Sequence, residues 1–121
     1  MSAEVDAYIA ARPPDQRQAL TALRARLCTL LPDHAEAMSY AMPGFRTPGP
    51  KGKMVVGYAA FTRHLGLYPH SGSVIPVIDC RPFKTSKSGV LFTPDCPLPD
   101  ALLRLIIETH QAELVAGYGK R

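Results

Sequence analysis

The spacing of apolar residues predicts two helices in the first third of the chain. Ser2 stands at the cap position of a short helix whose inner face carries Val5, Tyr8 and Ile9. Pro13-Pro14 closes this helix and opens a second one, which Pro32 ends. The second helix has leucines at helical spacing, namely Leu20, Leu23, Leu27, Leu30 and Leu31. The spacing of Asp33 and Glu36 is that of a capping box and predicts one further helical turn.

The period changes after a loop rich in proline and glycine, Pro43 to Gly52. Residues Met54 to Phe61 are apolar on both faces, as in a central strand. Thr62-Arg63 is short enough to connect a hairpin, so His64 to Tyr68 is predicted to return antiparallel to that strand. Gly89 to Thr93 has the composition of a third strand.

A last helix opens at Pro99 and stops at Gly117. Its inner stripe consists of Leu103, Ile106, Ile107, His110 and Leu114. The segment from Ser71 to Asp79 stays open between a short helix capped by Ser73 and irregular chain, since Pro76 and β-branched residues oppose a helix. Hairpin-linked strands flanked by helices predict an α+β fold, a two-layer sandwich with an antiparallel sheet and helices on one face. Residues 1–121 are expected to form a single domain.

Composition narrows the class of protein. The 121 residues are 46% hydrophobic and carry a formal net charge of +4, which is modest for a nucleic-acid binder, so nucleic acid is not expected as a partner. No apolar run is long enough to span a bilayer, and the first residues are polar and acidic, unlike a signal peptide. We therefore expect a cytoplasmic protein without a membrane partner.

Motifs for metal binding or catalysis are missing from the sequence. The three cysteines lack the CxxC spacing of a zinc site, and an odd number argues against a disulfide framework. The four histidines are scattered, no acidic run is present, and a positive chain is a poor trap for cations. Neither a GxSxG elbow nor a P-loop occurs. We expect no metal, no cofactor and no catalytic residues. The alternative is an enzyme whose site has no recognised motif.

The segment Ser39–Phe45 is unusually rigid and apolar for a loop, which predicts that it packs against the core or forms the rim of a pocket. On the returning strand, His64 and Tyr68 share one face, while the leucines between them point to the other. A pocket at this place would be lined by Tyr40, Met42, Pro43, Phe45, His64 and Tyr68. The alternative is that these side chains have packing roles alone, and the sequence favours that alternative.

A second candidate is the turn Lys84-Thr85-Ser86-Lys87-Ser88-Gly89, which is cationic and rich in hydroxyl groups. Such a turn can hold an anion through side-chain donors and backbone N–H groups. Lys84 and Lys87 are therefore candidate ligand-binding residues for an anion, against the simpler interpretation of a solvated turn.

Four motifs in the same order resemble the YdhG-like family, small bacterial domains of unknown function. They are Ser39-Tyr40-Ala41-Met42-Pro43-Gly44-Phe45, His64-Leu65-Gly66-Leu67-Tyr68-Pro69 after Ala59-Ala60-Phe61, Phe83-Lys84-Thr85-Ser86-Lys87, and Pro97-Leu98-Pro99. The resemblance implies a secretion-chaperone-like α/β sandwich. Some members are described as frataxin-type iron chaperones, so an intracellular iron chaperone is a second alternative. The chain departs from the family at residues 71–81 and at His110.

Taken together, these features predict an uncharacterised, non-enzymatic binding domain. Its ligand would be a small molecule or a partner protein, bound where Ser39–Phe45 meets the sheet.

Overall fold

The computed structural model describes residues 2–115, so the predicted stop at Gly117 lies outside the described residues. The described chain forms three α-helices, one short 3-10 helix and six strands. The helices are α1 (Ala3–Ala10), α2 (Pro14–Leu30), η1 (Ile75–Val77) and α3 (Asp100–Val115). The strands are β1 (Ala35–Ser39), β2 (Met42–Arg46), β3 (Met54–Ala60), β4 (Leu65–Tyr68), β5 (Lys84–Thr85) and β6 (Val90–Phe92).

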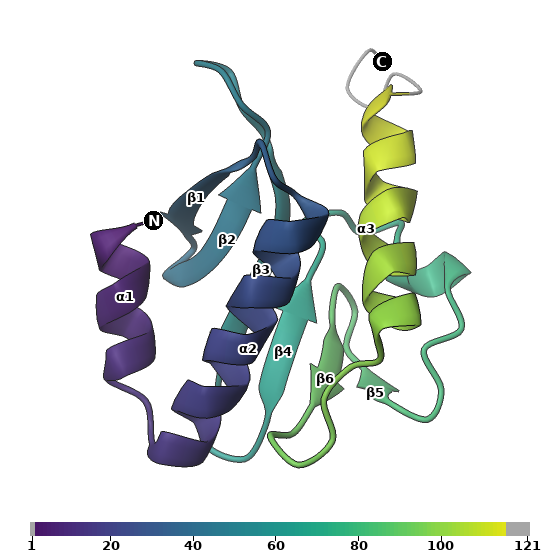
Figure 1. Ribbon diagram of the computed structural model, residues 1–121. Helices are drawn as coiled ribbons and strands as arrows, with labels where there is room; N and C mark the ends of the chain where they lie inside the picture. The colour runs from purple at the N-terminus through teal and green to yellow at the C-terminus, as the bar shows by residue number, and fades with distance from the viewer. Residues whose placement is uncertain (1, 116–121) are drawn as a thin grey trace.

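The strands form one sheet in the order β1-β2-β3-β4-β6-β5, and every neighbouring pair is antiparallel. All three α-helices lie on one side of this sheet (Figure 1). The α+β fold class is therefore confirmed, as are the central strand, the antiparallel returning strand and the last strand. The turn Thr62-Arg63 closes the predicted hairpin, where the Phe61 N–H donates to the His64 carbonyl at 2.8 Å.

Two local predictions were wrong, and the segment that the sequence left open, Ser71 to Asp79, contains the short 3-10 helix η1. Asp33 and Glu36 do not open a helical turn; Ala35–Ser39 is strand β1, because all five of its residues pair with β2. Ser39–Phe45 is not a loop but the tip of that hairpin together with most of β2. Ser73 does not cap a helix; its hydroxyl donates to the Glu113 carboxylate instead, and η1 has no side-chain cap.

Strand register assigns side chains to the two faces. Glu36, Phe45 and Val56 lie opposite one another across β1, β2 and β3, and Tyr58 lies opposite Leu67. These positions face the helices, and their apolar members join the helix residues in the core. The register shifts between Phe45 and Arg46, so Val55 is an extra residue in β3, and it is fully buried. The core thus lies between the sheet and the helices.

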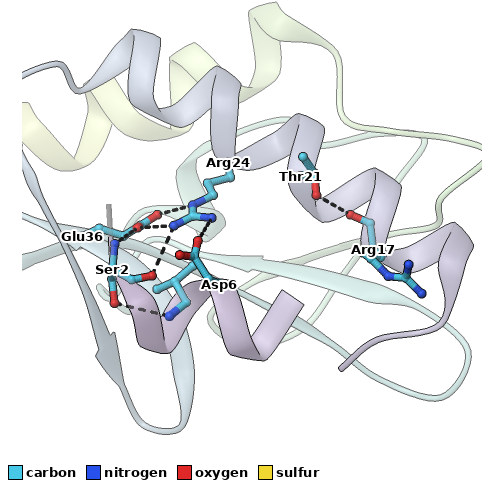
Figure 2. Close-up of polar contacts among 7 residues, drawn as sticks. Ser2, Asp6, Arg17, Thr21, Arg24 and Glu36 are labelled. Carbon is cyan, nitrogen blue, oxygen red and sulfur yellow. Dashed lines mark hydrogen bonds and ion pairs between the residues drawn. The ribbon is translucent and has the colours of Figure 1, made fainter. Parts of the chain in front are cut away.

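An ion-pair network holds β1 to the helices (Figure 2). Arg24 of α2 donates from Nε and Nη2 to the Glu36 carboxylate at 2.7 and 2.6 Å, and from Nη1 to Asp6 of α1 at 2.7 Å. The Ser2 N–H also donates to Glu36. Burial alone would raise the pKa of Glu36, but the hydrogen bonds from Arg24 and Ser2 outweigh it and lower that pKa. Glu36 is therefore an anchoring carboxylate beneath α2.

Candidate functional site

The turn between β1 and β2 is strained and exposed. Tyr40 and Ala41 have φ angles of 53° and 61°, the left-handed conformation that two-residue hairpins usually fill with Asn and Gly. The side chain of Tyr40 is nonetheless large and 86% exposed. The prediction that the segment Ser39–Phe45 packs against the core was therefore wrong for Tyr40: Ser39 and Met42 pair directly, which leaves Tyr40 at the hairpin tip.

His70 follows β4 and meets this tip. Its ring stacks on that of Tyr40, with the centroids 6.1 Å apart and an interplanar angle of 22°. His70 also has a left-handed backbone, with φ of 56°. Within residues 2–115, Tyr40, Ala41 and His70 are the three non-glycine residues with positive φ; Tyr40 and His70 stack on each other, and Ala41 follows Tyr40 in the turn. Sequence reasoning missed His70, because nothing in Pro69-His70-Ser71 indicates a contact with a distant hairpin.

The floor beneath His70 is a glycine. A Cβ atom at Gly57 would lie 2.6 Å from His70 Nε2, so the ring sits directly over the strand backbone. His70 Nε2 is buried and has no hydrogen-bond partner among residues 2–115. Burial, together with the nearby His110, lowers the pKa of His70, so the imidazole is neutral over a wider range of pH than usual.

Tyr68 covers the neighbouring part of the same face. It lies opposite Gly57 in the β3–β4 pairing. Its ring lies over two further glycines: Cβ atoms at Gly66 and Gly89 would fall 2.5 and 2.4 Å from ring atoms. Tyr40, His70 and Tyr68 thus lie over the sheet face that the α-helices leave open, and we call these residues the aromatic surface.

Other contacts fix the chain that carries His70. Ser71 and Ser73 both donate to the Glu113 carboxylate of α3, Ser71 at 2.9 Å. His110, one turn earlier in α3, has its Nδ1 2.8 Å from the Val55 carbonyl oxygen. These polar residues tie the segment after β4 to α3 and to β3, which keeps His70 in place.

The remaining candidates do not form one pocket. Phe45 is 2% exposed and belongs to the core on the other side of the sheet, whereas Pro43 is buried and Met42 half-buried. His64 stacks on Phe61 and lines a separate pocket with Lys84. Lys87 lines another pocket, together with Thr85 and Ser86. The structure therefore brings Tyr40 and Tyr68 to one face, pairs His64 with Lys84, and leaves Lys87 apart.

Metal ligands are not assembled in the described chain. Within residues 2–115, no three His, Cys, Asp or Glu side chains lie close enough to hold a metal ion. No helix of this part of the chain is both long and apolar enough to cross a membrane.

Comparison with known proteins identifies a solved structure with a similar fold. No protein-family model and no curated protein matches the chain. The crystal structure of YdhG from Bacillus subtilis, a protein of the DUF1801 family, is similar over 98% of this chain and 94% of its own, with a TM-score of 0.80 and 15% sequence identity. This likeness concerns architecture, and it agrees with the YdhG-like motifs in the sequence. The chain therefore resembles the YdhG-like family in its motifs and has the fold of the DUF1801 protein YdhG.

Proposed function

We propose that this chain is a non-enzymatic binding domain that holds a partner protein against the aromatic surface, with Tyr40 as the anchoring side chain. The observation that carries the proposal is the stacking of the exposed Tyr40 on His70, where both residues, and Ala41 next to Tyr40 in the turn, have a left-handed backbone. Backbone strain of this kind persists where the surroundings enforce it, and it clusters at functional sites.

Stability alone does not explain Tyr40. A left-handed non-glycine residue costs roughly 1–2 kcal/mol, and stacking of two aromatic rings returns about 0.5–1.5 kcal/mol. The side chain is 86% exposed, so burial contributes little to offset the strain. A tyrosine presented to solvent on a hairpin tip is, by contrast, what a protein interface uses as an anchor, since tyrosine is enriched among residues that dominate binding energy.

The shape of the surface favours a protein over a small molecule. Small-molecule sites are concave, whereas Tyr40 lies exposed on a two-residue hairpin turn. The pockets described here are lined by other residues. The iron-chaperone alternative has no such support, because the described residues form no cluster of three His, Cys, Asp or Glu side chains that could hold iron. The proposed location of this domain remains the cytoplasm.

Site-specific photocrosslinking tests the proposal. Tyr40 is replaced by p-benzoylphenylalanine, which keeps an aromatic ring at the tip, in cells that make the chain. Val77, a 71% exposed residue of η1, is replaced in the control. We expect a discrete crosslinked protein from position 40 that the control does not give.

Competition decides whether the adduct is specific. Excess unmodified chain should abolish the crosslink, and excess Tyr40→Asn/Ala41→Gly chain should not. Identical adducts from both positions, or a crosslink that both competitors abolish equally, would refute the proposal. An adduct of small-molecule mass would replace the partner protein by a small ligand.

A further inference from the structure

A second site lies outside the aromatic surface. A pocket of about 370 Å³ opens where the β3–β4 turn approaches β5, β6 and the turn after β6. This volume is at the lower end of the range of small-molecule sites, about 300–1,000 Å³. Its lining residues are Arg63, His64, Phe83, Lys84, Leu91, Phe92, Thr93 and Cys96.

The polar part of this lining is cationic. Arg63 and Lys84 both line the pocket, and no carboxylate of the described residues does. Within residues 2–115, neither Arg63 nor Lys84 forms a salt bridge. Asp95, in the turn after β6, lines a different pocket. A hydrogen bond from Thr93 lowers the pKa of its carboxyl group. Two cations that form no salt bridge with residues 2–115 therefore line one pocket.

The rest of the lining is apolar and held in place. Leu91 lies opposite Lys84 in the β5–β6 pairing and opposite Gly66 of β4, so it shares the open face with Lys84. Phe83 is half-buried beside it. His64 is fixed by stacking on Phe61, with the ring centroids 4.9 Å apart. An apolar floor next to cationic groups matches a ligand that has both an apolar body and a negative end.

We propose that this pocket binds a small organic anion, a carboxylate or sulfonate with an aromatic or aliphatic body. Arg63 and Lys84 hold the anionic group, since hydrogen bonds between charged groups are stronger than neutral ones. Phe83 and Leu91 contact the body of the ligand. This site differs from the sequence-based expectation, because Lys84 acts with Arg63 and not with Lys87.

Titration with 1-naphthoate, followed by protein NMR, tests the site. We expect the amide signals of Arg63, His64, Lys84 and Leu91 to shift together with a single dissociation constant. Uncharged 1-naphthamide has the same aromatic body but lacks the negative charge. We expect it to bind at least about tenfold more weakly than 1-naphthoate, because the loss of one charge-assisted contact corresponds to that factor.

Two variants and a control complete the test. Arg63→Gln and Lys84→Gln should each weaken naphthoate binding about tenfold. Lys87→Gln removes the same charge three residues from Lys84, at a residue that lines another pocket, and should leave binding unchanged. Bound naphthoate should also slow alkylation of Cys96, the exposed cysteine, while leaving Cys28 unaffected. The proposal is overturned if naphthamide binds as well as naphthoate, if Lys87→Gln weakens binding as much as Lys84→Gln, or if neither probe shifts these signals.

Discussion

On the face under the helices the sheet presents large side chains such as Tyr58 and Leu67, whereas the open face presents glycines at positions 44, 57 and 66. The covered face is shielded by a layer of α-helices (Figure 1). The open face is shielded by single rings, since Tyr68 lies over Gly66 and His70 over Gly57. Both devices remove backbone from water, but the second leaves the rings themselves at the surface.

This difference separates stability from recognition. Fully buried apolar side chains contribute about 1.5–3 kcal/mol each, and they gather on the covered face. Two of the three left-handed residues, Tyr40 and His70, belong to the aromatic surface over the open face. We therefore expect changes on the covered face to act on the free energy of unfolding, and changes at Tyr40 to act on binding.

The largest effect is expected from breaking the ion pair between Arg24 and Glu36. Their side chains are 11% and 5% exposed, and removing one member of a buried pair costs about 3–5 kcal/mol because the other charge stays buried. Glu36→Ala should lower the free energy of unfolding by about 3 kcal/mol in urea denaturation. Asp6→Ala removes the second, 60% exposed partner of Arg24 and should cost less than about 1 kcal/mol. Equal losses in the two variants would contradict the assignment.

A smaller loss is expected at Gly44 of β2, which lies opposite Gly57 of β3. A Cβ atom there would lie 2.5 Å from both the Val56 carbonyl oxygen and Met54 Cε, and the carbonyl cannot move without disturbing the β2–β3 pairing. Gly44→Ala should cost about 2 kcal/mol, as overpacking does. Gly72→Ala, which meets no atom within 4 Å, is the matched control and should change unfolding little. A neutral Gly44→Ala would show that the floor of the open face tolerates side chains.

Acid should weaken the covered face through Glu36. Its folded-state pKa lies below the ordinary value of 4.5, so folding favours the carboxylate form. The stability this provides is complete above that value and is lost as the pH falls through the lowered folded pKa. Urea denaturation across this range should show a smaller loss in Glu36→Gln than in the unchanged chain. The same pH dependence in both proteins would assign the acid sensitivity to other groups.

The smallest change, and one of opposite sign, is expected at the hairpin tip. Tyr40→Asn/Ala41→Gly supplies the residues that a left-handed two-residue turn prefers, and should raise the free energy of unfolding by about 1 kcal/mol. Thermal unfolding measures it, with Val77→Asn as a control for replacing an exposed apolar residue. A destabilised double variant would mean that the Tyr40–His70 stacking outweighs the strain.

The sequence predicted those strands whose own residues have the apolar pattern and the turn spacing of a strand. Met54–Ala60 is apolar on both faces, and its partner follows a two-residue turn, so both were predicted. Strand β1 was not, because Ala35-Glu36-Ala37-Met38 consists of good helix formers, and pairing with β2 overrides that preference. The tip was missed because Tyr40 and Ala41 occupy positions where a turn signal would be glycine or asparagine.

The candidate site was predictable only in part. The segment Ser39–Phe45 contains Tyr40, which belongs to the aromatic surface. The same segment also contains Phe45, which faces the core, because neighbouring strand positions alternate between faces. His70 and Arg63 became candidates only through the three-dimensional structure: the His70 ring lies over Gly57, and Arg63 lines one pocket with Lys84.

The ring of Tyr68 also constrains how this sequence can change over evolutionary time. Because it occupies the space above Gly66 and Gly89, any larger residue at either glycine requires the ring to leave, and losing the ring exposes both glycines at once. Positions 66, 68 and 89 are therefore expected to change together. A single substitution at a glycine or at Tyr68 is disfavoured, whereas a combined replacement of all three residues is allowed. Relatives with this fold should divide into two groups, one with an aromatic residue over two glycines and one with small side chains at all three positions.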